Sequence, residues 1–209
     1  MDLACYTDKQ KNHKEYGIYK MITTGERQYG TLSEIRRDHL ARYEFVTSQL
    51  TNDDLVIDAA CGCGYGTYLM AQKAKHVIGY DNSKEAIDYA IKHYESPNSF
   101  FEQTDLPCVV PVNDIAVCFE TIEHVKDPHA LLRNLRESST KLFASVPNQD
   151  RLPFRQEQFP FHRRHYTKQD FDKLLNETGW VVNQWYGQED AYSEVEKDVN
   201  GRTLIVECI

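Results

Sequence analysis

A glycine-rich turn directly after a buried strand is the feature that most constrains this chain. The strand is the apolar run Leu55-Val-Ile-Asp-Ala59, and the turn that follows is Cys61-Gly62-Cys63-Gly64-Tyr65-Gly66. Because glycine lacks a Cβ atom, such a turn lets backbone amides and the N-terminus of the next helix approach a ligand closely. We therefore expect a ligand to bind at the carboxyl end of this strand.

Short apolar runs alternate with amphipathic segments along most of the chain, which predicts crossover units on a parallel sheet. The last two predicted strands are joined by a long acidic connection and should pair antiparallel. The expected fold is one α/β domain with a Rossmann-like, mostly parallel seven-stranded sheet, an antiparallel C-terminal strand and helices on both faces. The strands are expected at 55–59, 76–80, 100–103, 114–119, 141–146, 181–186 and 202–208, and helices are expected after Gly66 and from Ser83, Asp127 and Thr167.

The polar, weakly periodic residues 1–30 are expected to form an N-terminal arm or lid, and residues 31–209 the domain itself. Thr31-Leu-Ser-Glu34 has the sequence of a capping box, which predicts that a helix begins there. The apolar stripe that supports this helix is Leu32, Ile35, Leu40, Tyr43, Val46 and Leu50.

The charge balance argues against a general polyanion-binding surface. Among 209 residues, 24 Lys and Arg stand against 32 Asp and Glu, a net charge of -8. A local cluster of Arg151, Arg155, Arg163 and Arg164 leaves an RNA end open as an acceptor, but the net charge disfavours it. With no leader-like segment, no long apolar run and six cysteines interpreted as free thiols, we expect a cytoplasmic protein without a membrane partner. The oligomeric state is left open.

Three aspartates, Asp58, Asp81 and Asp105, end or follow successive predicted strands, where open α/β sheets bind ligands. The order Asp-x-x-Cys-Gly-x-Gly-x-Gly from Asp58 resembles motif I of class I S-adenosylmethionine-dependent methyltransferases. It differs from the dinucleotide fingerprint, because Thr67 stands where a third glycine is needed.

This resemblance implies S-adenosylmethionine as the cofactor. It implies that Asp58 and the Gly62 backbone hold the methionine part, Asp81 the ribose hydroxyls and Asp105 the adenine amino group. The residues predicted to bind the cofactor are Asp58, Cys61, Gly62, Gly64, Gly66, Asp81, Asn82, Asp105, Leu106 and Glu120.

A second group of residues, Glu120-Thr-Ile-Glu123-His124, follows the fourth predicted strand. If the segment turns helically, its two carboxylates and imidazole share one face, a donor set that suits a divalent cation. The pattern resembles the Glu-x-x-Glu-His motif of small-RNA 2′-O-methyltransferases, which adds a later histidine, and it is similar to that of ubiquinone-pathway O-methyltransferases. The resemblance implies Mg²⁺ or Mn²⁺ and four metal ligands, Glu120, Glu123, His124 and His162.

The chain also resembles the broad type 11 methyltransferases of sugars and small metabolites, in which the same residues shape the acceptor pocket. There, a segment like Gly25-Glu-Arg27 precedes the first helix and is expected to close over the cofactor. In the absence of a metal, Glu120 would face the sulfonium, Glu123 would lie on a solvated helix face and His124 would bind a backbone carbonyl.

The residues predicted to be catalytic are His165, as a general base titrating near neutrality, together with His124 and Glu120. We predict O-methylation of a hydroxyl on a sugar, nucleotide, RNA end or small aromatic metabolite. The alternatives are metal-independent N- or C-methylation and a cofactor-binding regulatory subunit without turnover.

Overall fold

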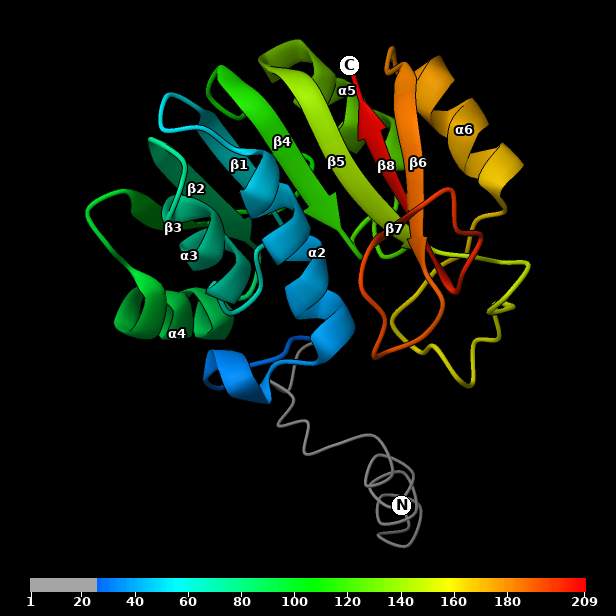
Figure 1. The fold of residues 1–209 in the computed structure, drawn as a ribbon, viewed down its shortest axis with the longest axis horizontal. Coiled ribbons are helices and arrows are strands. Elements are labelled where there is room, and N and C mark those ends of the chain that lie inside the picture. Colours follow the sequence, from blue (N-terminus) through cyan, green and yellow to red (C-terminus); the bar gives the residue numbers. More distant parts are fainter. Residues whose placement is uncertain (1–25) are drawn as a thin grey trace, which may run out of the picture.

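One mixed eight-stranded sheet organises the computed structural model, which describes residues 26–209 (Figure 1). The strands are β1 Leu55–Ala59, β2 His76–Asp81, β3 Ser99–Gln103, β4 Asn113–Phe119, β5 Ser139–Pro147, β6 Val182–Gln188, β7 Glu196–Lys197 and β8 Thr203–Cys208. The α-helices are α2 Arg37–Gln49, α3 Tyr65–Ala71, α4 Lys84–Tyr94, α5 Pro128–Ser138 and α6 Lys168–Glu177.

The strand order is β3-β2-β1-β4-β5-β8-β6-β7, and the first five strands are parallel. Strand β8 runs antiparallel to both of its neighbours, β5 and β6, and points the opposite way in Figure 1. The predicted Rossmann-like sheet with an antiparallel C-terminal strand is therefore confirmed. The structure adds β7, a two-residue strand on β6 inside the acidic connection, which is too short to produce an alternating pattern in the sequence.

Helices cover both faces of the sheet, and successive residues of each central strand enter opposite cores. Val56 packs with residues of α2 and α3, whereas Ile57 packs with residues of α5 and α6. A strand buried on both faces reads as a continuous apolar run, as the sequence around Val56 does. The two cores hold the central strands rigidly and fix the positions of their carboxyl ends.

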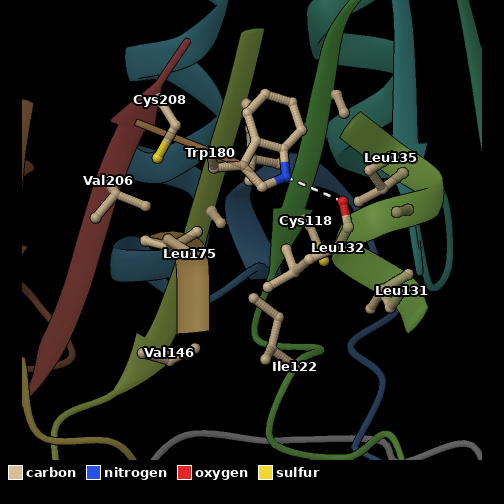
Figure 2. Packing of buried hydrophobic residues seen from close by; sticks show 14 of the residues in the cluster. Cys118, Ile122, Leu131, Leu132, Leu135, Val146, Leu175, Trp180, Val206 and Cys208 are labelled. Carbon is tan, nitrogen blue, oxygen red and sulfur yellow. Dashed lines mark hydrogen bonds between the residues drawn. The ribbon is translucent and has the colours of Figure 1, made fainter. Parts of the chain in front are cut away.

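Trp180 anchors the core between α5, α6 and the sheet. Its side chain is fully buried, and its Nε1–H donates to the Leu132 carbonyl of α5 at 3.0 Å (Figure 2). Leu131, Leu135 and Leu175 surround it. A buried indole needs a partner for its N–H, and here the helix backbone supplies it.

The predicted helix caps are confirmed at three positions. Asp127 accepts from the Ala130 amide at the start of α5, Ser83 accepts from Ala86 at the start of α4, and Thr167 accepts from Asp170 at the start of α6. A short oxygen side chain satisfies one of the free amides of the first turn in each case.

The helix predicted from Thr31 begins later than expected. Glu34 does accept hydrogen bonds from the Thr31 amide and hydroxyl, but the box closes only a 3-10 turn over Leu32–Glu34. The chain is extended at Ile35, and the Arg36 amide donates to the Gln28 side chain instead of to a helical carbonyl. Helix α2 therefore starts at Arg37.

Among the residues that the structure describes, no helix is long and apolar enough to cross a membrane. The predicted N-terminal arm over residues 1–30 lies outside the described residues, except for 26–30.

The role of Trp180 in stability can be tested by substitution. Trp180→Ala should lower the free energy of unfolding by about 3–5 kcal/mol, because a large buried side chain is deleted. Trp180→Phe should cost about 1–3 kcal/mol, since the ring stays but the Leu132 carbonyl loses its donor. Urea unfolding followed by circular dichroism measures both.

The matched control is Val181→Ala at the adjacent position, where the side chain is 60% exposed. It should change the free energy of unfolding by less than about 0.5 kcal/mol. Equal losses at the two positions would contradict the assigned packing.

Candidate active site

A cavity of about 410 Å³ opens at the carboxyl ends of β1, β2 and β4. Its walls come from the segment before α2, helix α2, the glycine turn, the ends of the strands and the loop after β5. The lining residues are Glu26, Arg27, Gln28, His39, Arg42, Tyr43, Ala60, Cys61, Gly62, Cys63, Tyr65, Asp81, Asn82, Leu106, Phe119, Glu120, Thr121, His124, Val125, Lys126 and Phe161.

The three glycines of the turn differ in what they do. Gly62 lines the cavity with φ +56°, and a Cβ there would meet only Arg27 Cγ at 3.9 Å. Gly64 and Gly66 lie outside the lining. A Cβ on Gly66 would come within 2.3 Å of the Tyr43 ring, and one on Gly64 within 2.6 Å of Ala90. These two glycines therefore permit helix packing, while Gly62 alone of the three borders the space for a ligand.

Asp81, at the end of β2, is the centre of a hydrogen-bond network on the side of the cavity where the cofactor is predicted to bind. Its Oδ2 accepts from the Gly62 amide at 3.0 Å, and its Oδ1 accepts from the Ser83 amide at 2.8 Å. Arg27 also donates to Oδ1 through Nε at 2.9 Å, and its Nη2 donates to Asn82 Oδ1 at 2.7 Å. An arginine thus binds the carboxylate that the sequence analysis assigned to ribose.

Asp58 lies beneath the cavity and not in its lining. The side chain is fully buried and accepts from the Tyr43 hydroxyl at 3.1 Å and the Thr67 hydroxyl at 2.7 Å. Burial raises the pKa of Asp58 to about 7, because the two hydroxyl hydrogen bonds offset only part of the desolvation and the charge of Asp81 adds to it. Asp58 therefore positions the walls of the site through two hydroxyl groups.

Some of the other residues predicted to bind the cofactor line the cavity, and one does not. Cys61, Asn82 and Leu106 line the cavity. Asp105 is exposed and lies outside the lining, one residue before Leu106. The assignment of Asp105 to the adenine amino group stays a prediction.

Two non-glycine residues with positive φ mark the ends of the central strands. Ala60 follows β1 with φ +65°, and Glu120 follows β4 with φ +47°. Both line the cavity, and such strained positions cluster at functional sites. Ser145 of β5 holds Glu120 in place by donating to its carboxylate at 2.9 Å and accepting from its amide at 3.1 Å.

Glu123 is the most unusual group near the cavity. Its carboxylate is fully buried, and neither oxygen has a hydrogen-bond partner among the described residues. Burial, followed by the charge of Glu120, raises the pKa of Glu123 well above its ordinary value. Its Oε1 lies 3.9 Å from His124 Nε2. A buried carboxylate without a partner is costly, so a site of this kind is suited to a cation or a shared proton.

Backbone carbonyls orient the histidines. His124 Nδ1 donates to the Phe161 carbonyl at 3.1 Å, and His165 Nδ1 donates to the Leu152 carbonyl at 2.5 Å. In its neutral form His165 therefore accepts through Nε2, so the proton of the 2.8 Å contact belongs to His162 Nδ1. The hydrogen bond to Phe161 leaves Nε2 of neutral His124 without a proton, whereas Nε2 of His162 donates to Glu26 Oε2 at 2.9 Å.

His165 is not placed to act as a base on a ligand in the cavity. Both of its ring nitrogens are engaged, its side chain is buried, and it lies outside the lining residues. Burial lowers the pKa of His165 and of His124 below the ordinary value. The geometry instead makes His165 a positioning residue for His162.

The predicted metal ligands are brought together only in part. Three side chains each place one ligand atom within 4.8 Å of the other two: Glu26, His124 and His162. Glu26 Oε2 is 2.9 Å from His162 Nε2. Glu120 and Glu123 are neighbours of this cluster without belonging to it. Glu26 was not among the predicted ligands, and its only signal in the sequence is its place in the Gly25-Glu-Arg27 segment.

The arginines of the loop after β5 connect the two histidine-bearing segments. The Arg163 amide donates to the Glu123 carbonyl at 2.8 Å, and its side chain donates to the His124 carbonyl at 2.9 Å. Arg164 donates to the Val125 carbonyl at 3.1 Å. These guanidinium groups hold His124 against the loop of His162, so their role in the structure is positional.

Arg42 is a further residue that the sequence analysis missed. It lines the cavity from α2 and is almost fully buried. Its Nη1 donates to Gln188 at 2.7 Å, whereas Nε and Nη2 have no partner within residues 26–209. No pattern marked it, because in the sequence it is one more charge on an amphipathic helix.

Comparison with known proteins agrees with this architecture. A family model described as "Methyltransferase domain" matches residues 33–184. A Mycolicibacterium smegmatis protein named "Probable S-adenosylmethionine-dependent methyltransferase" is 29% identical over 195 residues, or 88% of this chain and 75% of that protein. A ubiquinone biosynthesis O-methyltransferase of Coxiella burnetii is 26% identical over 156 residues, or 69% of this chain and 67% of that enzyme.

The chain spans between 55% and 75% of the length of these and similar curated relatives. Among solved structures, an S-adenosylmethionine-dependent methyltransferase from Clostridium acetobutylicum matches with a TM-score of 0.66 at 12% identity. The match covers 98% of each chain. At this identity the likeness concerns the fold.

The raised pKa of Asp58 predicts a pH-dependent stability. The folded state holds the Asp58 proton more tightly than the unfolded state does, so ionisation of Asp58 destabilises the folded protein. This loss of stability is absent below about pH 4, grows as the pH rises to about 7, and is complete above that pH. Relative to wild type, Asp58→Asn should gain roughly 2–4 kcal/mol in free energy of unfolding between pH 4.5 and pH 8. Urea unfolding of both proteins at the two pH values measures this change, and a constant difference between them would refute it.

The Arg27–Asp81 contact predicts the effect of a second substitution. If the ribose hydroxyls bind Asp81, Arg27 competes with them, and Arg27→Ala should bind S-adenosylhomocysteine about threefold to tenfold more tightly. Calorimetric titration measures the affinity. Arg37→Ala, which removes an exposed arginine paired with Glu44 and Glu194, is the control and should leave it unchanged. Weaker binding by Arg27→Ala would instead make Arg27 a cofactor contact.

Proposed function

The chain belongs to the S-adenosylmethionine-dependent methyltransferase family, and from that premise we propose that it methylates a hydroxyl group of a small molecule with the help of a divalent cation. The observation that carries the proposal is the pairing of two half-sites in one cavity. The cofactor half contains Gly62 and Asp81. The acceptor half contains Glu120 and His124 and adjoins the carboxylate of Glu123, which has no hydrogen-bond partner in the described part of the chain.

On the cofactor side, we assign the ribose hydroxyls to Asp81, because a carboxylate can accept two hydroxyl hydrogen bonds. The Gly62 backbone would border the methionine part, and Leu106 would pack against the adenine. Glu120, on its strained backbone at the end of β4, lies where it can face the sulfonium. Asp58 supports this side from below through Tyr43 and Thr67.

On the acceptor side, the donor set fits a divalent cation. His124 presents an Nε2 lone pair, and His162 would present one if an ion replaced the proton that it shares with Glu26. Glu123 and Glu120 supply carboxylates close by. Two imidazoles with carboxylates suit Mn²⁺ or a similar borderline ion better than Mg²⁺. Such an ion, when bound, lowers the pKa of a coordinated hydroxyl and makes it a nucleophile at neutral pH.

The residues of this chain have the remaining task of positioning. Methyl transfer from a sulfonium requires the nucleophile in line with the carbon–sulfur bond, and holding two reactants in that geometry removes much of the barrier. Arg163 donates to the His124 carbonyl, and His165, anchored on the Leu152 carbonyl, contacts the His162 ring, so the acceptor side is preorganised. The proton of the acceptor hydroxyl would pass to Glu120, a carboxylate that lines the cavity.

Among acceptor classes, we favour a metabolite with adjacent hydroxyls, such as a sugar or an aromatic diol. Two neighbouring hydroxyls can chelate one cation, and the Coxiella relative is named for O-methylation in ubiquinone biosynthesis. An RNA end is less favoured, because the net charge is -8 and Arg163 and Arg164 bind backbone carbonyls. Five described cysteines are free, which suits the cytoplasm as the place of the reaction.

The proposal predicts cation-dependent turnover. With a panel of aromatic diols, sugar nucleotides and RNA oligonucleotides, formation of S-adenosylhomocysteine should occur with an adjacent-hydroxyl metabolite, stop with EDTA and return with Mn²⁺. Glu123→Gln and His124→Gln should lower kcat by about 100-fold, as loss of metal-site residues does. Glu194→Gln, which removes an exposed carboxylate paired with Arg37, should have no effect.

The other outcomes are equally specific. Turnover that EDTA leaves intact would overturn the cation and favour metal-independent N- or C-methylation. Tight binding of S-adenosylhomocysteine without turnover on any acceptor would favour a regulatory subunit.

A further inference from the structure

We propose that Glu26 is a cation ligand carried by the segment before α2, so that binding of a divalent cation and docking of this segment onto the acceptor side are one event. The inference rests on the proposed function, because it concerns the same cation. The inference goes beyond the proposed function by adding a ligand from outside the Glu120–His124 and His162 motifs.

The first support is the convergence of donors from distant parts of the chain. Glu26 precedes α2, His124 follows β4 and His162 follows β5, yet one ligand atom of each lies within 4.8 Å of the other two. Ligand atoms about 2.1 Å from one ion are at most about 4.2 Å apart, so small movements of these side chains would let all three bind a common ion. Glu26 and His124 both line the cavity, so an ion at this point would reach the acceptor.

The second support is the direction of the two Nε2 atoms. Phe161 and His165 occupy Nδ1 of His124 and His162, respectively, which leaves Nε2 of each ring as the atom available to a ligand. His162 Nε2 donates to Glu26 Oε2 at 2.9 Å, and a bound ion would take the place of this proton. Imidazoles that are anchored through Nδ1 have the outer-shell arrangement that orients metal ligands.

The third support is the unbalanced negative charge around the cluster. The Glu123 carboxylate is fully buried without a hydrogen-bond partner among residues 26–209, its Oε1 is 3.9 Å from His124 Nε2, and the charge of Glu120 acts on it. A divalent ion beside His124 would compensate this buried charge at short range. Glu26 is itself 37% exposed, so an ion can enter from its side of the cluster.

The consequence for the segment follows from the neighbouring residue. Arg27 contacts Asp81 on the cofactor side, while Glu26 contacts His162 on the acceptor side. A cation at Glu26 would hold the segment across the site even when the cofactor displaces the Arg27 side chain. The cation would thereby keep the cavity covered during the reaction.

The experiment is a Mn²⁺ titration of the full chain, followed by electron paramagnetic resonance of free Mn²⁺. Glu26→Gln should raise the Kd for Mn²⁺ about tenfold or more, and Glu26→Asp should raise it less, because it keeps the carboxylate. Glu194→Gln, the matched exposed carboxylate, should bind like wild type. Thermal unfolding without Mn²⁺ checks that the variants are folded.

Trypsin cleavage after Arg27 gives a second readout that is independent of activity. Mn²⁺ should slow release of the fragment that begins at Gln28 about fivefold in wild type and leave it unchanged in Glu26→Gln, because a held segment resists the protease. The cleaved fragments are quantified by mass spectrometry.

Two results would overturn the inference in distinguishable ways. If Glu26→Gln binds Mn²⁺ like wild type while His124→Gln does not, Glu26 is no ligand, and the cation of the proposed function stands. If wild type binds no Mn²⁺ with or without S-adenosylhomocysteine, the cation-assisted function fails together with the inference.

Discussion

Parallel pairing of β1 with both β2 and β4 is the constraint on which the rest of the structure depends. It places the ends of three strands at one edge, so that Gly62, Asp81 and Glu120 border the same cavity although they are far apart in the chain. The pairing is stable because each central strand is buried on both faces between two helical layers. Rigid strands make this edge a fixed frame, on which loops carry the chemistry.

Electrostatic compensation is the second organising element of the site. Four carboxylates, those of Asp58, Asp81, Glu120 and Glu123, crowd this edge. Asp81 is balanced by Arg27 and by two amides, whereas Glu123 has no partner among the described residues. At Asp81, the uncharged ribose of the cofactor is proposed to replace the guanidinium group of Arg27. Near Glu123, a divalent cation is proposed to bind.

The fold was predictable to a large extent because its determinants are local. The run around Val56 indicated a buried strand, and the caps at Ser83, Asp127 and Thr167 marked helix starts that the structure confirms. The predicted start of α2 was wrong, because the capping box at Thr31 closes a 3-10 turn instead of the first turn of the α-helix. Strand β7 has only two residues and therefore carries no periodic signal.

The sequence by itself determined the α/β class, the glycine turn and the acidic residues at the strand ends, because short-range spacing and strand burial specify them. Only the tertiary structure decided which of these groups face the cavity. It placed Asp58 and His165 outside the lining of the cavity, with His165 hydrogen-bonded to His162. It also brought Glu26 into contact with His162, which is 136 positions away in the chain. Contacts of such sequence separation depend on how whole elements pack, and no local pattern of residues encodes them.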